Sequence, residues 1–323
     1  MTDFGHVASA NRACSLLYSF IKEQPQGIWL LPVNVCPDVP LTFVLAGIQF
    51  QFVDIDPQTL CIDIDECKRR IKSKDTIIIG LVYVRTYGFL SDTSELFFSL
   101  KDANSKICII DDRCLCIPEV PSDFGGADMI LYSTGHCKPI DFGGGGLAFY
   151  AQTTVYNSDA NLYYDGTDEE RLYKEAYAKE MPFSSTPQGW LHLGQYKNPD
   201  IYLHEISQSR KKRIEQREKL NEIYRDSLPK SIQMDLSFQD WRFNIIVPST
   251  IKKNILNKLF DNGLFASSHY HSANRLFDTY EYRYSDRLFS HIINLFNDKY
   301  YTEEKAIKTC RIINEIYKSI NRV

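Results

Sequence analysis

The sequence predicts an α/β protein with a large domain, built on a mostly parallel sheet, and a smaller α+β domain at the C-terminal end. Short apolar runs alternate with helical patterns through residues 1–155, which is typical of βαβ units. A glycine-rich turn separates two of these runs. The last third instead combines a long polar helix, a strand-like run and further helices. We expect a large domain over 1–200 and a small domain over 201–323.

The N-terminal elements follow from apolar spacing and from turn residues. Apolar side chains from Ala13 to Ile21 recur at helical spacing, and Ser9 precedes them as a candidate N-cap. A helical stretch through Val44 ends at Gly47. The segments that follow alternate between the two types. The predicted strands are 28–32, 49–55, 76–84, 107–110, 129–132 and 147–150, and the other predicted helices are 63–71 and 94–100.

The C-terminal half begins with a segment of weak periodicity. Residues 156–200 are rich in Tyr, Asp, Pro and Gly, and we interpret them as an irregular connection across the active-site side. The elements after it are a polar helix over 203–226 with the pair Glu215–Lys219, a strand over 241–248, a helix over 251–262 ended by Gly263, and a last helix begun by Thr302.

Composition excludes several classes of protein. The 323 residues are 44% hydrophobic and carry a formal charge of −4, so we expect no nucleic-acid partner. The nine cysteines contain no CxxC pair, which argues against a metal site and favours reduced thiols in the cytoplasm. The N-terminus does not resemble a signal peptide and no run of eighteen apolar residues occurs, so we expect no membrane partner.

The most informative motif runs from Ser133 to Gly146. Four consecutive glycines begin five residues after Lys138, and glycine is kept where the backbone turns tightly or approaches another group closely. A lysine on such a turn, with a hydroxyl five residues earlier, suits a Schiff base beside a phosphate. The alternative is a surface loop with a solvated lysine.

Two further segments favour the first interpretation. Asp111 and Asp112 follow a predicted buried strand, where ligands of parallel sheets bind, although they could also cap the strand end. Pyridoxal phosphate needs a carboxylate that keeps its ring nitrogen protonated. The segment 8–12 offers small residues at the start of the first helix, whose free N–H groups suit a phosphate. Together the three segments predict a pyridoxal-phosphate site.

The order and spacing of these segments resembles the StrS/DegT family of sugar aminotransferases, which have fold type I of the pyridoxal-phosphate enzymes. The resemblance runs from about residue 8 to the C-terminus and is strongest in 31–63 and 107–146. Residues 52–56, Phe-Val-Asp-Ile-Asp, are similar to that family's FVDID stretch. Residues 133–146 are similar to its S-x4-K-x4-G-x-GG segment, which is the most specific match.

The resemblance implies roles for individual residues. Lys138 matches the lysine that carries the cofactor, Asp112 the partner of the ring nitrogen, and Ser133 a phosphate ligand. The other positions that match cofactor-binding segments are Ser9, Ala10 and Asn11 at the phosphate, Cys36 where an aromatic side chain often covers the ring, Tyr87 at the cofactor's border, and Asn198 as the nearest candidate for a segment that reaches the neighbouring subunit's cofactor.

The resemblance also implies an activity. We expect a cytoplasmic homodimer that moves an amino group from an amino acid, glutamate by resemblance, to a keto group of a nucleotide-linked sugar, in surface polysaccharide or secondary metabolite biosynthesis. Only eight residues precede the phosphate-binding segment, and Leu115 stands where Gln or His is common. A smaller keto substrate, or a non-catalytic regulatory relative of the fold, are therefore the alternatives.

Overall fold

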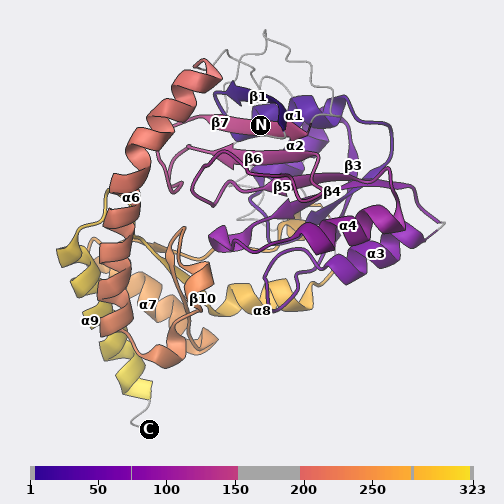
Figure 1. The fold of residues 1–323 in the computed structure, drawn as a ribbon. Helices are drawn as coiled ribbons and strands as arrows, with labels where there is room; N and C mark the ends of the chain where they lie inside the picture. The colour runs from indigo at the N-terminus through magenta and orange to yellow at the C-terminus, as the bar shows by residue number, and fades with distance from the viewer. Residues whose placement is uncertain (1–3, 74, 152–196, 278–279, 321–323) are drawn as a thin grey trace.

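A computed structural model of the chain describes residues 4–73, 75–151, 197–277 and 280–320 (Figure 1). Its main feature is a seven-stranded sheet in the order β1-β7-β6-β5-β4-β2-β3. The strands are β1 (Phe4–Ala10), β2 (Ile28–Pro32), β3 (Gln49–Val53), β4 (Ile78–Val84), β5 (Cys108–Asp112), β6 (Met129–Ser133) and β7 (Gly146–Ala151).

The sheet is mostly parallel, as the sequence predicts. Strands β3, β2, β4, β5 and β6 pair in parallel, and β7 and β1 add two antiparallel pairs at one edge. Strands β4 and β6 are apolar along nearly their whole length, as expected for strands whose two faces are both covered by helices. Their carboxyl ends therefore meet at one edge, and β5 and β6 end there at Asp112 and Ser133.

Two layers of helices enclose this sheet. One apolar core includes α1 (Ala13–Lys22) and α2 (Asp38–Ala46), and the other includes α3 (Ile64–Lys72), α4 (Ser94–Ala103) and the start of α6. Gly47 ends α2 in the left-handed conformation at φ 68°, as its position in the sequence predicts. Asp63 caps α3 by accepting the N–H groups of Asp65 and Glu66.

A second, smaller sheet lies in the C-terminal part. The long helix α6 (Pro199–Ser227) leads from the first sheet to the second (Figure 1). The second sheet has the order β8-β10-β9. Its elements are β8 (Phe243–Ile246), α7 (Ser249–Asp261), β9 (Ala266–Ser267), α8 (Arg283–His291), β10 (Ile292–Leu295) and α9 (Glu303–Ile320), with short 3-10 helices at Thr86–Gly88, Lys230–Ile232, Leu236–Phe238 and Ala273–Leu276.

The structure corrects two local predictions. Ser9 does not cap the first helix, because residues Phe4–Ala10 form β1 and Arg12 occupies the N-cap position of α1. Ser9 lies opposite Leu147 of β7, and its hydroxyl donates to the carbonyl of Lys197. The pair Glu215–Lys219 does not form either, since Lys219 binds Glu303 of α9 and Glu215 faces Lys211. Most of the predicted irregular connection, 156–200, lies outside the described residues.

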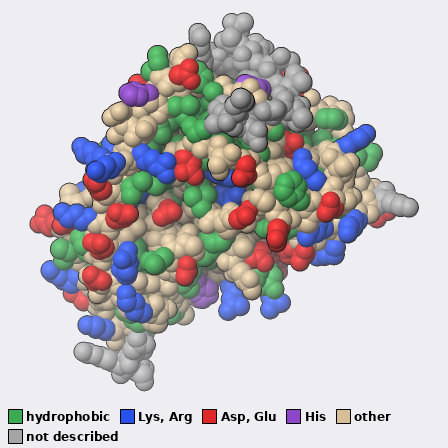
Figure 2. Space-filling view, viewed as in Figure 1, with side chains coloured by type: hydrophobic (Ala, Val, Ile, Leu, Met, Phe, Trp, Pro, Cys, Tyr) green, Lys and Arg blue, Asp and Glu red, His purple; other side chains and the backbone are tan. Residues whose placement is uncertain are grey.

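The surface shows no segregation of charge on the face drawn in Figure 2. Lys and Arg side chains are interspersed with Asp and Glu over this face. This mixture agrees with the nearly balanced totals of 37 basic and 41 acidic residues. Among the helices that the structure describes, none is both long and apolar enough to cross a membrane.

Candidate active site

A cavity of about 240 Å³ lies at the carboxyl ends of the parallel strands. This is the edge at which open α/β sheets bind their ligands. The ends of β5 and β6, the first turns of α1 and α2, and the loop between β6 and β7 form its walls. The lining residues are Arg12, Ala13, Cys14, Leu17, Cys36, Asp38, Val39, Asp112, Cys114, Leu131, Ser133, Gly135, His136, Lys138, Gly143, Gly144 and Gly145.

The loop that carries Lys138 is held against the start of α1 by its glycines. Gly145 has φ 105° and donates its N–H to the carbonyl of Asn11 at 2.6 Å. A Cβ on Gly146 would lie 2.5 Å from the Cα of Ala13, so only glycine allows this approach. Gly143, at φ 82°, makes the preceding turn. The glycines therefore bring the Lys138 loop and the N-terminus of α1 together in the lining of one cavity.

Asp112 ends strand β5 inside this cavity and is 4% exposed. Its Oδ1 accepts the backbone N–H of Cys114 at 2.9 Å. Burial raises the pKa of Asp112, and this effect outweighs both the hydrogen bond from Cys114 and the nearby positive charge of Lys138. A cation placed against Asp112 would therefore relieve an unfavourable buried charge.

Lys138 faces the same space from the glycine-rich loop. Burial alone would lower the pKa of Lys138, but the acidic groups around it, which act in their ionised forms, reverse the direction and raise it; these are Cys114, Cys36, Asp112 and Asp38. Burial raises the pKa of Cys36 to about 12 and that of Cys114 as well, so both thiols are neutral near pH 7. Asp112 and Asp38 consequently provide the negative charge that Lys138 experiences.

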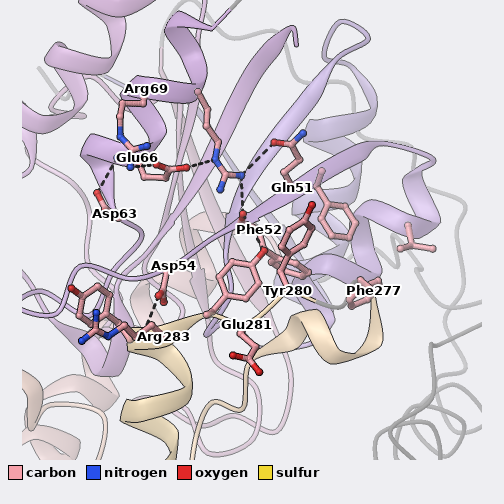
Figure 3. A pocket seen from close by; sticks show the side chains of 15 residues that line it. Gln51, Phe52, Asp54, Asp63, Glu66, Arg69, Phe277, Tyr280, Glu281 and Arg283 are labelled. Atoms are coloured by element: carbon pink, nitrogen blue, oxygen red, sulfur yellow. Dashed lines mark hydrogen bonds and ion pairs between the residues drawn. The ribbon is translucent and has the colours of Figure 1, made fainter. Parts of the chain in front are cut away.

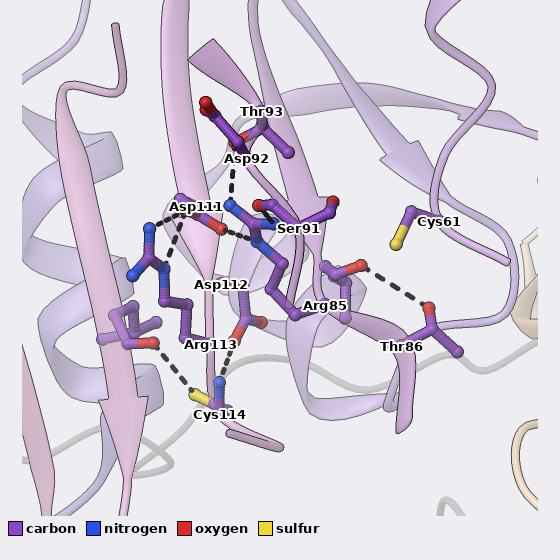
Figure 4. Close-up of polar contacts among 12 residues, drawn as sticks. Cys61, Arg85, Thr86, Ser91, Asp92, Thr93, Asp111, Asp112, Arg113 and Cys114 are labelled. Atoms are coloured by element: carbon purple, nitrogen blue, oxygen red, sulfur yellow. Dashed lines mark hydrogen bonds and ion pairs between the residues drawn. The ribbon is translucent and has the colours of Figure 1, made fainter. Parts of the chain in front are cut away.

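Asp111, the neighbour of Asp112, points to the other face of the sheet, as alternation along a strand requires (Figure 4). It accepts hydrogen bonds from Arg85 at 2.7 and 2.8 Å and from Arg113 at 2.8 Å. Arg85 also donates to Thr93 and to the carbonyl of Ser91. This buried network is satisfied internally, so only Asp112 of the two acids is available to a ligand.

A larger cleft, of about 940 Å³, lies elsewhere, beside the edge strand β3 (Figure 3). Three of its four lining acids are already used by the fold. Asp54 accepts the N–H groups of Tyr284 and Ser285, Asp63 caps α3, and Glu66 pairs with Arg70 at 2.7 Å. The smaller cavity is therefore the better candidate for the active site, because the oppositely charged side chains of Lys138 and Asp112 both lie there.

The residues around the smaller cavity fit pyridoxal phosphate. Arg12, at the N-cap of α1, makes no side-chain cap hydrogen bond, so the helix presents first-turn N–H groups without an intrahelical acceptor. Such a helix start suits a phosphate, and Ser133 lines the same space. A pyridinium nitrogen would supply the cation that buried Asp112 lacks, and Lys138 provides the amine. Among the described residues there is no group of three or more His, Cys, Asp or Glu side chains that could hold a metal ion.

The structure brings together only some of the residues singled out in the sequence. Lys138, Asp112, Ser133 and Cys36 all line the cavity. The three proposed phosphate ligands Ser9, Ala10 and Asn11 do not; the lining begins at Arg12, because the strand β1 extends to Ala10 and the helix starts later than expected. Asp38, Cys114 and His136 line the cavity and were not predicted, since nothing in their local sequence distinguishes them from ordinary loop residues.

The two remaining candidates lie outside the cavity lining. Tyr87 is buried, its hydroxyl donates to the carbonyl of His269, and its ring stacks on Trp241 with centroids 6.1 Å apart. Asn198 is exposed and caps α6 by accepting the N–H groups of Asp200 and Ile201. Within one subunit both side chains therefore serve the fold.

Comparison with known proteins finds a matching family model and solved structures of similar fold. A model of the DegT/DnrJ/EryC1/StrS aminotransferase family matches residues 7–307. A putative sugar aminotransferase from Streptococcus pneumoniae, solved in its PMP form, is similar over 97% of this chain and 88% of its own, with TM-score 0.72 and 16% identity. No curated protein matches the chain in sequence.

Two further solved structures share the fold. PseC of Helicobacter pylori, an aminotransferase involved in the biosynthesis of pseudoaminic acid, is similar over 98% of this chain and 88% of its own, with TM-score 0.70 and 16% identity. DesI, solved in the presence of its TDP-sugar product, is similar over 98% of this chain and 83% of its own, with TM-score 0.72 and 12% identity. These similarities confirm the predicted fold class.

Proposed function

We propose, from the premise that this chain belongs to the DegT/DnrJ/EryC1/StrS aminotransferase family, that it uses pyridoxal phosphate to aminate a keto group of a nucleotide-linked sugar. The observation that carries the proposal is that Lys138, Asp112, Ser133 and the start of α1 line one cavity. Glutamate is the amino donor we favour, by the resemblance of the sequence to its family. The TDP-sugar product bound by DesI supports the substrate class.

Different residues around the cavity would bind different parts of the cofactor. The first-turn N–H groups of α1 and the hydroxyl of Ser133 would bind the phosphate. Asp112 would face the ring nitrogen and keep it protonated. When bound, pyridoxal phosphate supplies an electron sink for the pair left behind when a substrate carbon loses its proton.

Lys138 would hold the cofactor and move the proton. As the amine on the cavity wall, Lys138 would take up the proton that the substrate carbon loses and would return it at the neighbouring position. Asp38 and Asp112 favour the ammonium form of Lys138. They therefore help it to retain the proton between removal and delivery.

We also place the division of the chain near the start of α6, with 1–200 as the cofactor-binding domain and 201–323 as the smaller domain. The separate apolar core around β8, β10, α7 and α9 supports this division. We propose a homodimer with its active sites at the subunit interface. The exposed position of Asn198, at the beginning of α6, leaves it accessible to a second subunit.

The absorption spectrum of the purified protein tests the proposal first. Wild type incubated with pyridoxal phosphate should show a band near ~420 nm that shifts to shorter wavelength with glutamate. Lys138→Ala should lose the band, and Lys106→Ala, which removes an exposed lysine, should keep it. A wild-type protein without the band would contradict the proposed chemistry and favour a non-catalytic relative.

Turnover tests the substrate class separately. The protein is first treated with glutamate, so that its cofactor carries the amino group, and the glutamate is then removed. Samples are mixed in parallel with a nucleotide-linked ketosugar and with a simple keto acid, and the products are identified by mass spectrometry. Amination of the ketosugar supports the proposal. Amination of the simple keto acid alone would support the alternative of a smaller keto substrate.

A further inference from the structure

The backbone around Lys138 is held by side chains from the C-terminal part of the chain. Trp241 donates its Nε1–H to the carbonyl of Cys137 at 2.9 Å. Nη2 of Arg217 donates to the carbonyl of Lys138 at 3.2 Å and to that of Pro139 at 3.4 Å. Three consecutive carbonyls are thus bound by two side chains that lie far away in the sequence.

Arg217 is an unusual buried cation. It lies in α6, is 5% exposed, and has no carboxylate within ion-pairing distance in the part of the chain that the structure describes. Its Nη1 donates to the carbonyl of Trp241 and to Oδ1 of Asn297, both at 2.5 Å, and to the carbonyl of Asp240 at 3.5 Å. Burial lowers the pKa of Arg217 to about 10. Burying a guanidinium whose hydrogen-bond acceptors are all neutral lowers the stability of the fold. We therefore expect its hydrogen bonds to have a role that an apolar side chain could not fill.

Residues 137–139 of the Lys138 loop have few other hydrogen bonds of their own. Cys137 adopts the left-handed conformation at φ 62°, which a non-glycine residue seldom adopts. Within the loop, the N–H of Cys137 donates to Asp141 at 3.1 Å and that of Lys138 to the carbonyl of Gly135 at 3.3 Å. Neither bond fixes the direction of the carbonyls at 137–139. The donors from Arg217 and Trp241 supply that restraint.

We propose that Arg217, supported by Trp241, is a positioning residue that fixes the backbone from which Lys138 reaches the cavity. The inference rests on the proposed function of Lys138 for its relevance to catalysis. Arg217 contacts the Lys138 loop through main-chain carbonyls only, so it acts on the cavity through Lys138. Its planar guanidinium spans the Lys138 and Pro139 carbonyls and the Trp241 carbonyl together, a set that a lysine ammonium cannot reach in the same geometry.

The test uses Arg217→Met, Arg217→Lys and a matched control, Lys252→Met. Lys252 is also a buried cation of the C-terminal part and donates to the carbonyl of Phe289, away from the loop. In the cofactor-free protein, hydrogen exchange of the amides at 135–142 should rise about tenfold in Arg217→Met and remain at the wild-type rate in Lys252→Met. Arg217→Lys should give an intermediate rate.

A second readout follows Lys138 itself. Trace acetylation of lysine amines, measured by mass spectrometry against pH, reports the reactivity of Lys138 without any cofactor. The pH at which Lys138 becomes reactive should change in Arg217→Met and should stay at the wild-type value in Lys252→Met. In wild type loaded with pyridoxal phosphate, the ~420 nm band should then form about tenfold faster than in Arg217→Met.

Each outcome decides the inference. Equal loop exchange and Lys138 reactivity in Arg217→Met and wild type would overturn it, whether or not the protein binds pyridoxal phosphate. A wild type without the ~420 nm band would instead contradict the proposed function and leave the loop measurements valid. Should Arg217→Met fail to fold, Trp241→Phe removes the donor to Cys137 while it keeps an aromatic ring, and the same exchange comparison applies.

Discussion

Asp111 and Arg85 form a bidentate ion pair, with Nε to Oδ1 at 2.7 Å and Nη2 to Oδ2 at 2.8 Å, in which both side chains are at most 1% exposed. Although burial alone would raise it, the two arginines Arg85 and Arg113 lower the pKa of Asp111. The adjacent Asp112 has its pKa raised. Two neighbouring acids thus serve opposite purposes, one structural and one available to a ligand.

Breaking that pair should unfold the protein more easily. Arg85→Met leaves the charge of Asp111 buried with one partner fewer, and we expect a loss of about 3–5 kcal/mol in the free energy of unfolding by urea. Lys68→Met, which removes a half-buried partner of the exposed Asp65, should cost less than ~0.5 kcal/mol. A loss below ~1 kcal/mol in Arg85→Met would show that Arg113 alone compensates.

The same ion pair makes the stability of the folded protein depend on pH. Because the folded protein holds Asp111 with a lowered pKa, its contribution is present above the unfolded value of about 3.9 and is lost as pH falls through the folded value. Wild type should therefore lose stability below about pH 4 more steeply than Asp111→Asn. Urea unfolding at several pH values measures both slopes, and parallel curves would contradict this expectation.

Asp112→Asn should separate stability from activity. The raised pKa of Asp112 means that the folded state retains its proton to higher pH than the unfolded state, so ionisation destabilises the cofactor-free protein as pH rises from about 4. We expect Asp112→Asn to be about 1 kcal/mol more stable than wild type at pH 7 without cofactor, and to transaminate about 10²-fold more slowly. Thermal unfolding and a coupled rate assay check the two parts independently.

The glycine loop allows a matched comparison. Gly146→Ala places a Cβ 2.5 Å from Ala13, whereas at Gly144 the nearest atom, the carbonyl oxygen of Asn11, is 3.5 Å away and φ is not left-handed. We expect a loss of about 1–3 kcal/mol and weaker cofactor retention for Gly146→Ala, and little change for Gly144→Ala. Dialysis followed by the ~420 nm absorbance measures retention. Equal cofactor retention in the two variants would mean that α1 can move away from β7 without loss of cofactor binding.

Tyr87→Phe distinguishes a packing role from a cofactor contact. The change removes the donor to the buried carbonyl of His269 and keeps the stack on Trp241, so a loss of about 1 kcal/mol is expected with an unaltered absorption band. Tyr300→Phe, at an exposed position, is the control. A shifted band in Tyr87→Phe would place the hydroxyl at the cofactor instead.

The parallel strands could be predicted from the sequence because they are buried on both faces. The apolar run 28–32 became β2 with the same bounds, and the runs before Asp112 and Ser133 became β5 and β6. Strand β1 was missed, because it forms only by pairing with β7, more than a hundred residues away. Its small residues resemble a helix start when they are considered locally.

The candidate site was predictable to the extent that it is local. Lys138 and Ser133 belong to one turn, and Asp112 follows one strand, so short motifs reveal them. Arg217 and Trp241 give no such signal. Arg217 belongs to a polar helix whose charged residues are mostly solvated, and only the tertiary structure shows that it is buried against the carbonyl of Lys138.

The pairing of β1 with β7 has a practical consequence for producing the protein. Ala10 pairs with Gly146, and Asn11 accepts the N–H of Gly145, so these two residues hold the glycine-rich loop in place beside the cavity. The C-terminal end of α9 lies at the opposite end of the molecule (Figure 1). An affinity tag for purification therefore belongs after α9, where its bulk and charge stay away from the strand that supports the binding site.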